Sequence, residues 1–296
     1  MRKEVFAIAL SVVAFGMVSC QQAQGDRKQE ATESEQAAAT ERTEEVKAQV
    51  ASTDEASGLK VETLKYKNPD QSHVRIEKSI DVPTGGDVRL VRKIGKWMGE
   101  LMEVEDVDMT TSKGREEFVR RAGEAQLKSF TKEYESALGD AEYEIPQFSC
   151  EESLDMAYQT DSYIVYVRYY YAYLGGAHGM YSTSAYTFKT SDGVLMESFF
   201  DKGKAAAMQQ VLSEGLIEYL KDRVEDPEDD LMGYYSLDDG LIPLPEAQQV
   251  EPTDSGLVVR YDVYQLGPYA LGEPTFCIPY KKAWPLLTEE AKGVLR

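Results

Sequence analysis

The sequence has 296 residues and a formal net charge of −20 at pH 7. A chain this acidic repels nucleic acid phosphates and anionic lipid head groups, which argues against both as ligands, and it attracts cationic partners. Acidity also serves simple solubility, so the charge alone does not select a partner. The 19 tyrosines and 9 phenylalanines supply core residues for β structure.

The N-terminus has the pattern of a lipoprotein signal peptide. Two basic residues at positions 2 and 3 precede an apolar run over residues 5–18. At about 14 residues, this run has the length of a secretory signal and is shorter than the ~20 residues of a membrane-spanning helix. It ends at Ser19 and Cys20, which resemble the lipobox of bacterial lipoproteins. We therefore expect residues 1–19 to be removed and acylated Cys20 to anchor the chain in the lipid bilayer. The alternative is an ordinary cleaved signal with Cys20 incidental.

Residues 20–58 predict a disordered acidic tether. This segment is rich in Gln, Glu, Ala, Thr and Ser and has no aromatic residue. Such a composition cannot bury enough apolar surface to offset the entropy of ordering. The tether would separate the lipid anchor from the folded part, whose about 238 residues suffice for one large domain or two small ones.

The first folded part, residues 59–140, predicts two strands followed by two helices. Strands are expected over residues 61–66 and 73–82, where apolar side chains alternate. Helices are expected over residues 88–102 and 113–138, where apolar residues recur at spacings of three and four. The residues expected to face inward are Val88, Val91, Ile94, Met98, Leu101 and Met102 in the first helix and Phe118, Ala122, Ala125, Phe130, Tyr134 and Leu138 in the second.

In the second folded part, residues 141–296, apolar residues mainly alternate with a period of two, which is typical of strands. The strongest strand is expected over residues 162–174, where both faces are apolar or aromatic, so it should lie inside a sheet. Ser191, Asp192 and Gly193 predict a hairpin turn. Because the elements do not alternate as βαβ units, the fold class should be α+β, with a largely antiparallel sheet and three main helices. The other expected elements are strands over 143–150, 154–160, 182–190, 194–197, 257–264 and 276–280, and helices over 202–223 and 284–295.

Two motifs in this part carry a family resemblance. A tyrosine-rich strand runs into Gly175-Gly176-Ala177-His178-Gly179, and Pro268-Tyr269-Ala270-Leu271-Gly272 precedes a strand that ends in Ile278-Pro279-Tyr280. In this order and spacing, residues 143–287 resemble the DUF3298 family. Residues 60–138 occupy the position of the DUF4163 region that often precedes it. The resemblance implies a DUF4163-like part over 59–140 and a DUF3298-like part over 141–296.

The resemblance also implies an extracytoplasmic location. Family members include bacterial lipoproteins of unknown role, accessory domains of peptidoglycan deacetylases, and a membrane anti-sigma factor whose external part is a lysozyme receptor. The chain shows neither a deacetylase domain nor a transmembrane helix, so the part of these functions that could transfer is the binding module.

The glycine-rich motif is the sharpest candidate site. Gly175, Gly176 and Gly179 permit positive φ and close backbone approach. His178 could then point into a groove as a ligand or a proton carrier. The alternative, which we favour, is a tight turn whose imidazole bonds to nearby backbone. Pro268, Tyr269 and Gly272 complete the candidate binding or structural motif.

Catalytic and metal sites are not expected. No nucleophile motif accompanies His178, and the other histidine, His73, has no ligand spacing to it. The acidic residues 225–230, with Asp238 and Asp239, lack the spaced oxygen ligands of a calcium loop and predict a solvated loop. No cofactor is expected.

Two cysteines remain besides Cys20. A disulfide between Cys150 and Cys277 is permitted outside the cytoplasm. Each lies in an apolar context, so two separate buried thiols are the alternative, and the one we favour.

The leading functional hypothesis is a non-catalytic binding module of the cell envelope, periplasmic or on the outer surface. Its partner would be a basic wall hydrolase of the lysozyme type or peptidoglycan itself. A structural or assembly lipoprotein is the second hypothesis. A cell-wall hydrolase or deacetylase is the third, and the missing nucleophile and metal motifs argue against it.

Overall fold

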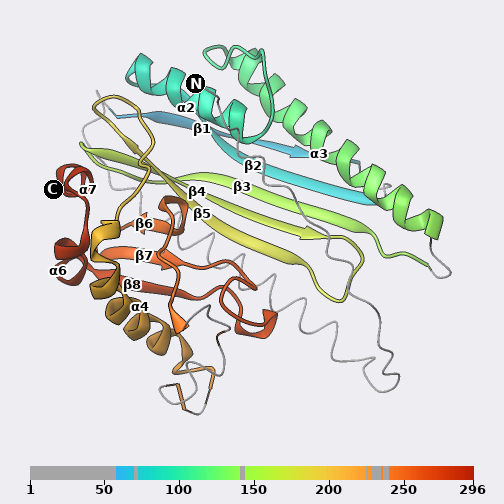
Figure 1. The fold of residues 1–296 in the computed structure, drawn as a ribbon. Helices are drawn as coiled ribbons and strands as arrows, with labels where there is room; N and C mark the ends of the chain where they lie inside the picture. The colour runs from blue at the N-terminus through green and yellow to red at the C-terminus, as the bar shows by residue number, and fades with distance from the viewer. Residues whose placement is uncertain (1–57, 70–72, 141–143, 225, 228–234, 236–239) are drawn as a thin grey trace, which may run out of the picture. The chain divides into compact units, whose positions relative to one another are not determined.

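The computed structural model describes residues 58–296, except 70–72, 141–143, 225, 228–234 and 236–239 (Figure 1). The predicted signal peptide, Cys20, nearly all of the tether and most of the acidic stretch therefore lie outside the described residues.

Five strands form the larger sheet, in the order β1-β2-β3-β4-β5. The β2–β3 pair is parallel and the other three pairs are antiparallel. A parallel pair needs a long crossover, and helices α2 (Val88–Leu101) and α3 (Ser112–Asp140) provide it. The strands are β1 (Lys60–Lys67), β2 (Val74–Gly85), β3 (Phe148–Gln159), β4 (Tyr163–Tyr173) and β5 (Met180–Lys189).

The smaller sheet contains three antiparallel strands, in the order β6-β7-β8. Helix α4 (Ala205–Leu220) packs on β8, where Gly215 allows the Phe276 ring to approach. The strands are β6 (Val250–Pro252), β7 (Gly256–Arg260) and β8 (Thr275–Pro279), and two short helices follow, α6 (Tyr280–Ala283) and α7 (Glu289–Val294). These elements confirm the prediction of an α+β fold.

Strand β4 is shared by two hydrophobic cores. Ile164 and Tyr166 pack in the core that α2 and α3 cover, whereas Tyr163, Val165 and Val167 pack with α4 and the smaller sheet. Both faces of this half of the strand are buried, as its apolar sequence predicts.

Charged residues in β3 explain one wrong prediction. Two strands were expected on either side of residues 151–153, but β3 is continuous. Glu152 is buried in its middle, where it bonds Lys78 of β2 and the Nε of Arg168 of β4, the latter at 2.6 Å. Burial alone would raise the pKa of Glu152, but the two cations outweigh it and lower that pKa. The carboxylate is therefore held inside the sheet, and it does not end the strand.

Four further expectations are corrected: three inward-facing residues and one strand. Val88 and Leu138 are 58% and 55% exposed, because each lies at a helix end that the sheet does not cover, and Ala125 is also exposed. The other nine residues of the two predicted stripes are buried or half-buried. Residues 194–197 form no strand: the chain turns at Gly193 and makes one bridge, between Phe188 and Leu195.

Glycine lets α3 approach the sheet. A Cβ on Gly123 would lie 2.2 Å from the Tyr66 ring of β1, whereas one on Gly139 would meet nothing within 4 Å. We expect Gly123→Ala to lower the free energy of unfolding by about 1–2 kcal/mol, because overpacking outweighs the better helix propensity of alanine. Gly139→Ala, the matched control, should be neutral or stabilising by up to ~1 kcal/mol. Chemical denaturation measures both. Equal gains in the two variants would contradict the close packing.

Candidate functional site

Two motifs that are far apart in the chain meet in one aromatic cluster. The turn at residues 175–179 follows β4, and the loop with Tyr264 and Tyr269 connects β7 to β8. The His178 imidazole stacks on the Tyr269 ring, with centroids 3.7 Å apart and an interplanar angle of 17°. The Tyr264 centroid lies 6.1 Å from that of His178 and 5.7 Å from that of Tyr269. We call His178, Tyr264 and Tyr269 the histidine–tyrosine cluster.

Both ring nitrogens of His178 are engaged. Nδ1 lies 3.0 Å from the carbonyl oxygen of Gly179, and Nε2 lies 3.1 Å from the Tyr264 hydroxyl. A carbonyl oxygen only accepts, so Nδ1 carries the proton and donates, and in the neutral ring Nε2 accepts from the hydroxyl. These bonds and the stack fix the orientation of an exposed imidazole.

Tyr264 has a strained backbone. Its φ is +67°, in the left-handed region, which costs a residue with a Cβ about 1–2 kcal/mol. The residue is 53% exposed, so burial of the ring does not offset that cost. The conformation belongs to a turn that a hydrogen bond from the Gln265 N–H to the Asp262 carbonyl oxygen closes, and a strained residue with an exposed side chain is a candidate functional position.

The cluster rests on the β4–β5 hairpin. Tyr181 of β5 meets the Tyr269 ring edge to face, with centroids 6.2 Å apart, and pairs across the strands with Tyr171 of β4. Gly179 allows this packing, because a Cβ there would lie 2.4 Å from the Tyr171 ring.

Glu273 ties the tyrosine loop to the larger sheet. Its buried Oε1 accepts a hydrogen bond of 2.7 Å from the backbone N of Thr183 in β5. Burial raises the pKa of the Glu273 carboxyl, against the smaller lowering effects of that bond and of Arg260. From α4, Tyr219 donates to the Leu271 carbonyl oxygen at 2.7 Å. The loop is thus held against both β5 and α4.

The remaining glycines and Pro268 shape these two turns. Gly175 has a φ of +77°, and a Cβ there would lie 2.9 Å from a ring of β3, whereas the nearest atom to one on Gly176 is 4.0 Å away. Pro268 precedes a short 3-10 turn over Tyr269–Leu271, and Gly272, with a φ of +70°, ends it.

The structure keeps the two cysteines apart. Both are free thiols: Cys150 is buried in β3, and Cys277 is exposed in β8. Burial raises the pKa of the Cys150 thiol to about 11, so it stays protonated at neutral pH.

The two histidines lie in different parts of the fold, because His73 stacks on Tyr134 of α3. Within the described part of the chain, no group of three or more His, Cys, Asp or Glu side chains could hold a metal ion.

Sequence reasoning did not single out Tyr264, Tyr181 or Glu273. Tyr264 ends the strand expected over residues 257–264, but the observed strand β7 ends at Arg260. The positive φ of Tyr264 has no sequence signal, because tyrosine rarely adopts that conformation. Glu273 follows Gly272 directly and looks like a surface carboxylate. A charged residue between a glycine turn and an apolar strand was the one available hint.

The family follows from two sequence matches. A family model described as Deacetylase PdaC matches residues 105–181, and a model described as a protein of unknown function, DUF3298, matches residues 197–281. The chain carries a DUF3298 domain preceded by a PdaC domain. None of the curated proteins matches the sequence.

Solved structures of other DUF3298 proteins show the same fold. One from Bacteroides fragilis has a TM-score of 0.63 at 17% identity, covering 82% of this chain and 99% of its own. One from Pseudomonas aeruginosa has a TM-score of 0.52 at 16% identity, covering 80% of this chain and 97% of its own.

The PdaC and DUF3298 domains build the histidine–tyrosine cluster together. His178 lies in the PdaC match, and Tyr264 and Tyr269 lie in the DUF3298 match. The glycine-rich motif, expected as a mark of DUF3298, thus falls among the residues matched by PdaC; the boundary expected after residue 140 stays a prediction. The two domains form an envelope-associated module of unknown function.

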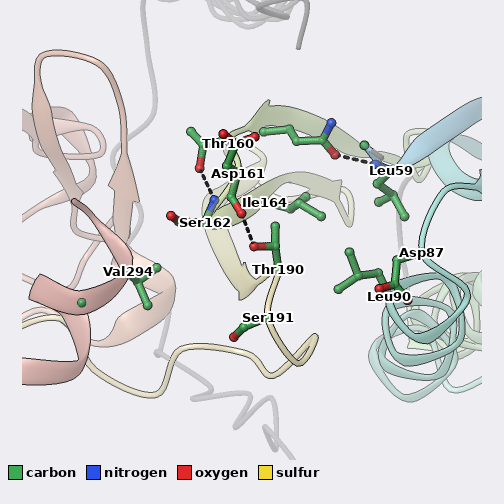
Figure 2. Close-up of a pocket in the computed structure, with 13 residues that line it drawn as sticks. Leu59, Asp87, Leu90, Thr160, Asp161, Ser162, Ile164, Thr190, Ser191 and Val294 are labelled. Atoms are coloured by element: carbon green, nitrogen blue, oxygen red, sulfur yellow. Dashed lines mark hydrogen bonds between the residues drawn. The ribbon is translucent and has the colours of Figure 1, made fainter. Parts of the chain in front are cut away.

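A cleft lies at the opposite end of the β4–β5 hairpin from the cluster. This cleft of about 460 Å³ has Asp87 and Leu90 on one side and Val294 on the other, with Asp161 and Thr190 between them (Figure 2). Local turns already use several of its polar groups: the Thr190 hydroxyl, for example, donates to the Asp161 carbonyl oxygen. None of the described residues that line it is His, Cys, Lys or Arg. It therefore offers less chemistry than the cluster.

Among the residues that the structure describes, no helix is both long enough and apolar enough to cross a bilayer.

The raised pKa of Glu273 predicts a pH-dependent stability difference. A carboxyl whose pKa is raised on folding stabilises the protein below its unfolded pKa, and this contribution is lost as pH rises through the folded pKa. Glu273→Gln keeps the acceptor for Thr183 and removes the buried charge. We expect the variant to be more stable than the parent at pH 7, with an advantage that shrinks as the pH falls through the raised pKa of Glu273. Thermal unfolding at several pH values measures this. A variant that is less stable at pH 7, with no pH trend, would contradict the burial effect.

Proposed function

We propose that the protein is a non-catalytic binding module of the cell envelope, anchored to the bilayer through Cys20, with peptidoglycan or a lysozyme-type wall hydrolase as its ligand. One observation carries the proposal: residues of the PdaC and DUF3298 domains meet in one aromatic cluster, in which His178 and Tyr264 are exposed and Tyr269 is half-buried. Exposed aromatic and imidazole groups held by their neighbours are typical of recognition surfaces.

The contacts of His178 support binding rather than catalysis. A catalytic histidine works with a nucleophile or an orienting carboxylate. The ring nitrogens of His178 instead meet a carbonyl oxygen and a tyrosine hydroxyl, and one ring face is covered by Tyr269.

Peptidoglycan is the ligand that the aromatic cluster favours, because tyrosine rings stack well on sugar rings. A wall hydrolase of the lysozyme type is the second candidate, and the net charge of −20 supports it. Opposite fields raise the rate of encounter with a cationic protein, although they do not by themselves make a specific site.

A binding assay with two arms tests the proposal. The purified full chain is mixed with insoluble peptidoglycan or with lysozyme at about 0.15 M salt, where the Debye length is about 8 Å. We expect saturable binding in one arm, weakened about tenfold or more by Tyr269→Ala. Val88→Ala, which alters an exposed residue of α2, is the control and should bind normally.

Each arm has a contradicting result. Saturable binding that Tyr269→Ala does not weaken would exclude the cluster as the binding surface. Absence of saturable binding in both arms would contradict the proposed function and favour a structural or assembly lipoprotein.

The lipid anchor has its own test. The apolar run that ends at Ser19 and Cys20 motivates it. Cys20→Ala removes the thiol that would be acylated, so the variant should leave the membrane fraction of cells while the parent stays in it. A variant that remains with membranes after alkaline carbonate extraction would contradict an anchor at Cys20.

A further inference from the structure

The exposed ring of Tyr264 is held out by a strained backbone. Its φ of +67° is a conformation that glycine adopts without strain, yet a large aromatic side chain occupies the position and remains 53% exposed. Two other non-glycine residues have positive φ, among those the structure describes, and neither is aromatic: Glu103 and Asp106. Tyr264 is the third residue of a turn closed by a hydrogen bond of 3.0 Å from the Gln265 N–H to the Asp262 carbonyl oxygen. Glycine or asparagine is usual at such a position when φ is positive, so an exposed tyrosine there is unexpected.

We propose that Tyr264 is a stacking platform for a pyranose ring of the cell-wall glycan. This inference rests on the proposed function and names the ligand class of the same site. The face of a phenol ring carries partial negative charge, and the axial C–H groups of a sugar ring present partial positive charge to it. Flat stacking of this kind is specific for the sugar face and needs no charge on the ligand.

The platform is oriented before the ligand arrives. The Tyr264 hydroxyl is bonded to Nε2 of His178, and that imidazole is held by the Tyr269 stack and the Gly179 carbonyl oxygen. A ring that is already fixed loses little conformational entropy on binding, which favours a weakly interacting ligand such as a sugar.

The chemical groups of the cluster itself suit a neutral ligand. The cation–π contacts of the described residues involve Tyr170 and Tyr219, and none involves the cluster. Its groups are two phenols and one imidazole, which match the hydroxyl groups and the apolar ring faces of a polysaccharide better than they match an anion.

Three variants test the platform in the full chain. Tyr264→Gly removes the ring and places glycine at a backbone conformation that suits it, so the melting temperature should not fall. Tyr264→Phe keeps the ring and loses the bond to His178, so its effect on binding should be the smaller one. Glu103→Gly relaxes positive φ on an exposed loop and is the matched control.

The probe is a preparation of glycan strands, which an amidase releases from peptidoglycan by removing the stem peptides that cross-link them. We expect the parent to bind it, Tyr264→Gly to bind on the order of tenfold more weakly, Tyr264→Phe to lose about threefold, and Glu103→Gly to match the parent. Untreated peptidoglycan and lysozyme are measured in parallel.

The possible failures are distinguishable. Tyr264→Gly that binds glycan as the parent does would overturn the platform and leave the proposed function standing. The platform would also be overturned if the parent bound only untreated peptidoglycan or only lysozyme, because the ligand would then be a peptide or a protein. If the parent binds none of the three probes, the proposed function itself fails.

Discussion

Burial of one strand on both faces is the constraint on which the rest of the structure depends. Alternate residues of the first half of β4 enter different cores: Ile164 and Tyr166 meet the helices, and Tyr163, Val165 and Val167 meet the smaller sheet. Each buried side chain contributes about 1.5–3 kcal/mol. A register slip of one residue would exchange the two sets, so both layers fix the register of β4 and thereby the position of the turn at its end.

That turn explains how a buried hairpin supports an exposed site. Beyond Val167 the strand is half-buried, and it runs into the glycines that present His178. The loop between β7 and β8 contacts this turn. The loop is held in place by the bond of its Glu273 to β5 and by the bond of Tyr219 of α4 to its backbone. Because these anchors come from different sequence regions, the histidine–tyrosine cluster exists only when the PdaC and DUF3298 parts are folded together. A surface that depends on both domains suits recognition that requires an intact module.

The sequence predicts the features of this fold that depend on neighbouring residues, and it does not predict those that depend on contacts between residues far apart in the chain. The spacing of apolar residues predicts α2, α3, β4 and α4 well, because each of these elements buries apolar side chains at regular intervals. It fails at β3, where Glu152 looks like a break until Lys78 and Arg168 are placed beside it. His178 and Tyr269 belong to motifs that the sequence shows. The hydrogen bond that joins the two turns, between His178 and Tyr264, connects residues 86 positions apart. The burial of Glu273 depends on its contact with Thr183 of β5, which is similarly distant in the sequence, so no local pattern reveals it.

The ligand surface that we propose for this module is the cluster at the joint of the two domains. Hydrogen exchange measured by mass spectrometry, with and without soluble peptidoglycan fragments, tests it most directly. We expect slower exchange in peptides that contain residues 174–181 and 262–273, and unchanged exchange around the cleft at residues 159–164 and 190–194. Protection at the cleft with none at the cluster would contradict this assignment.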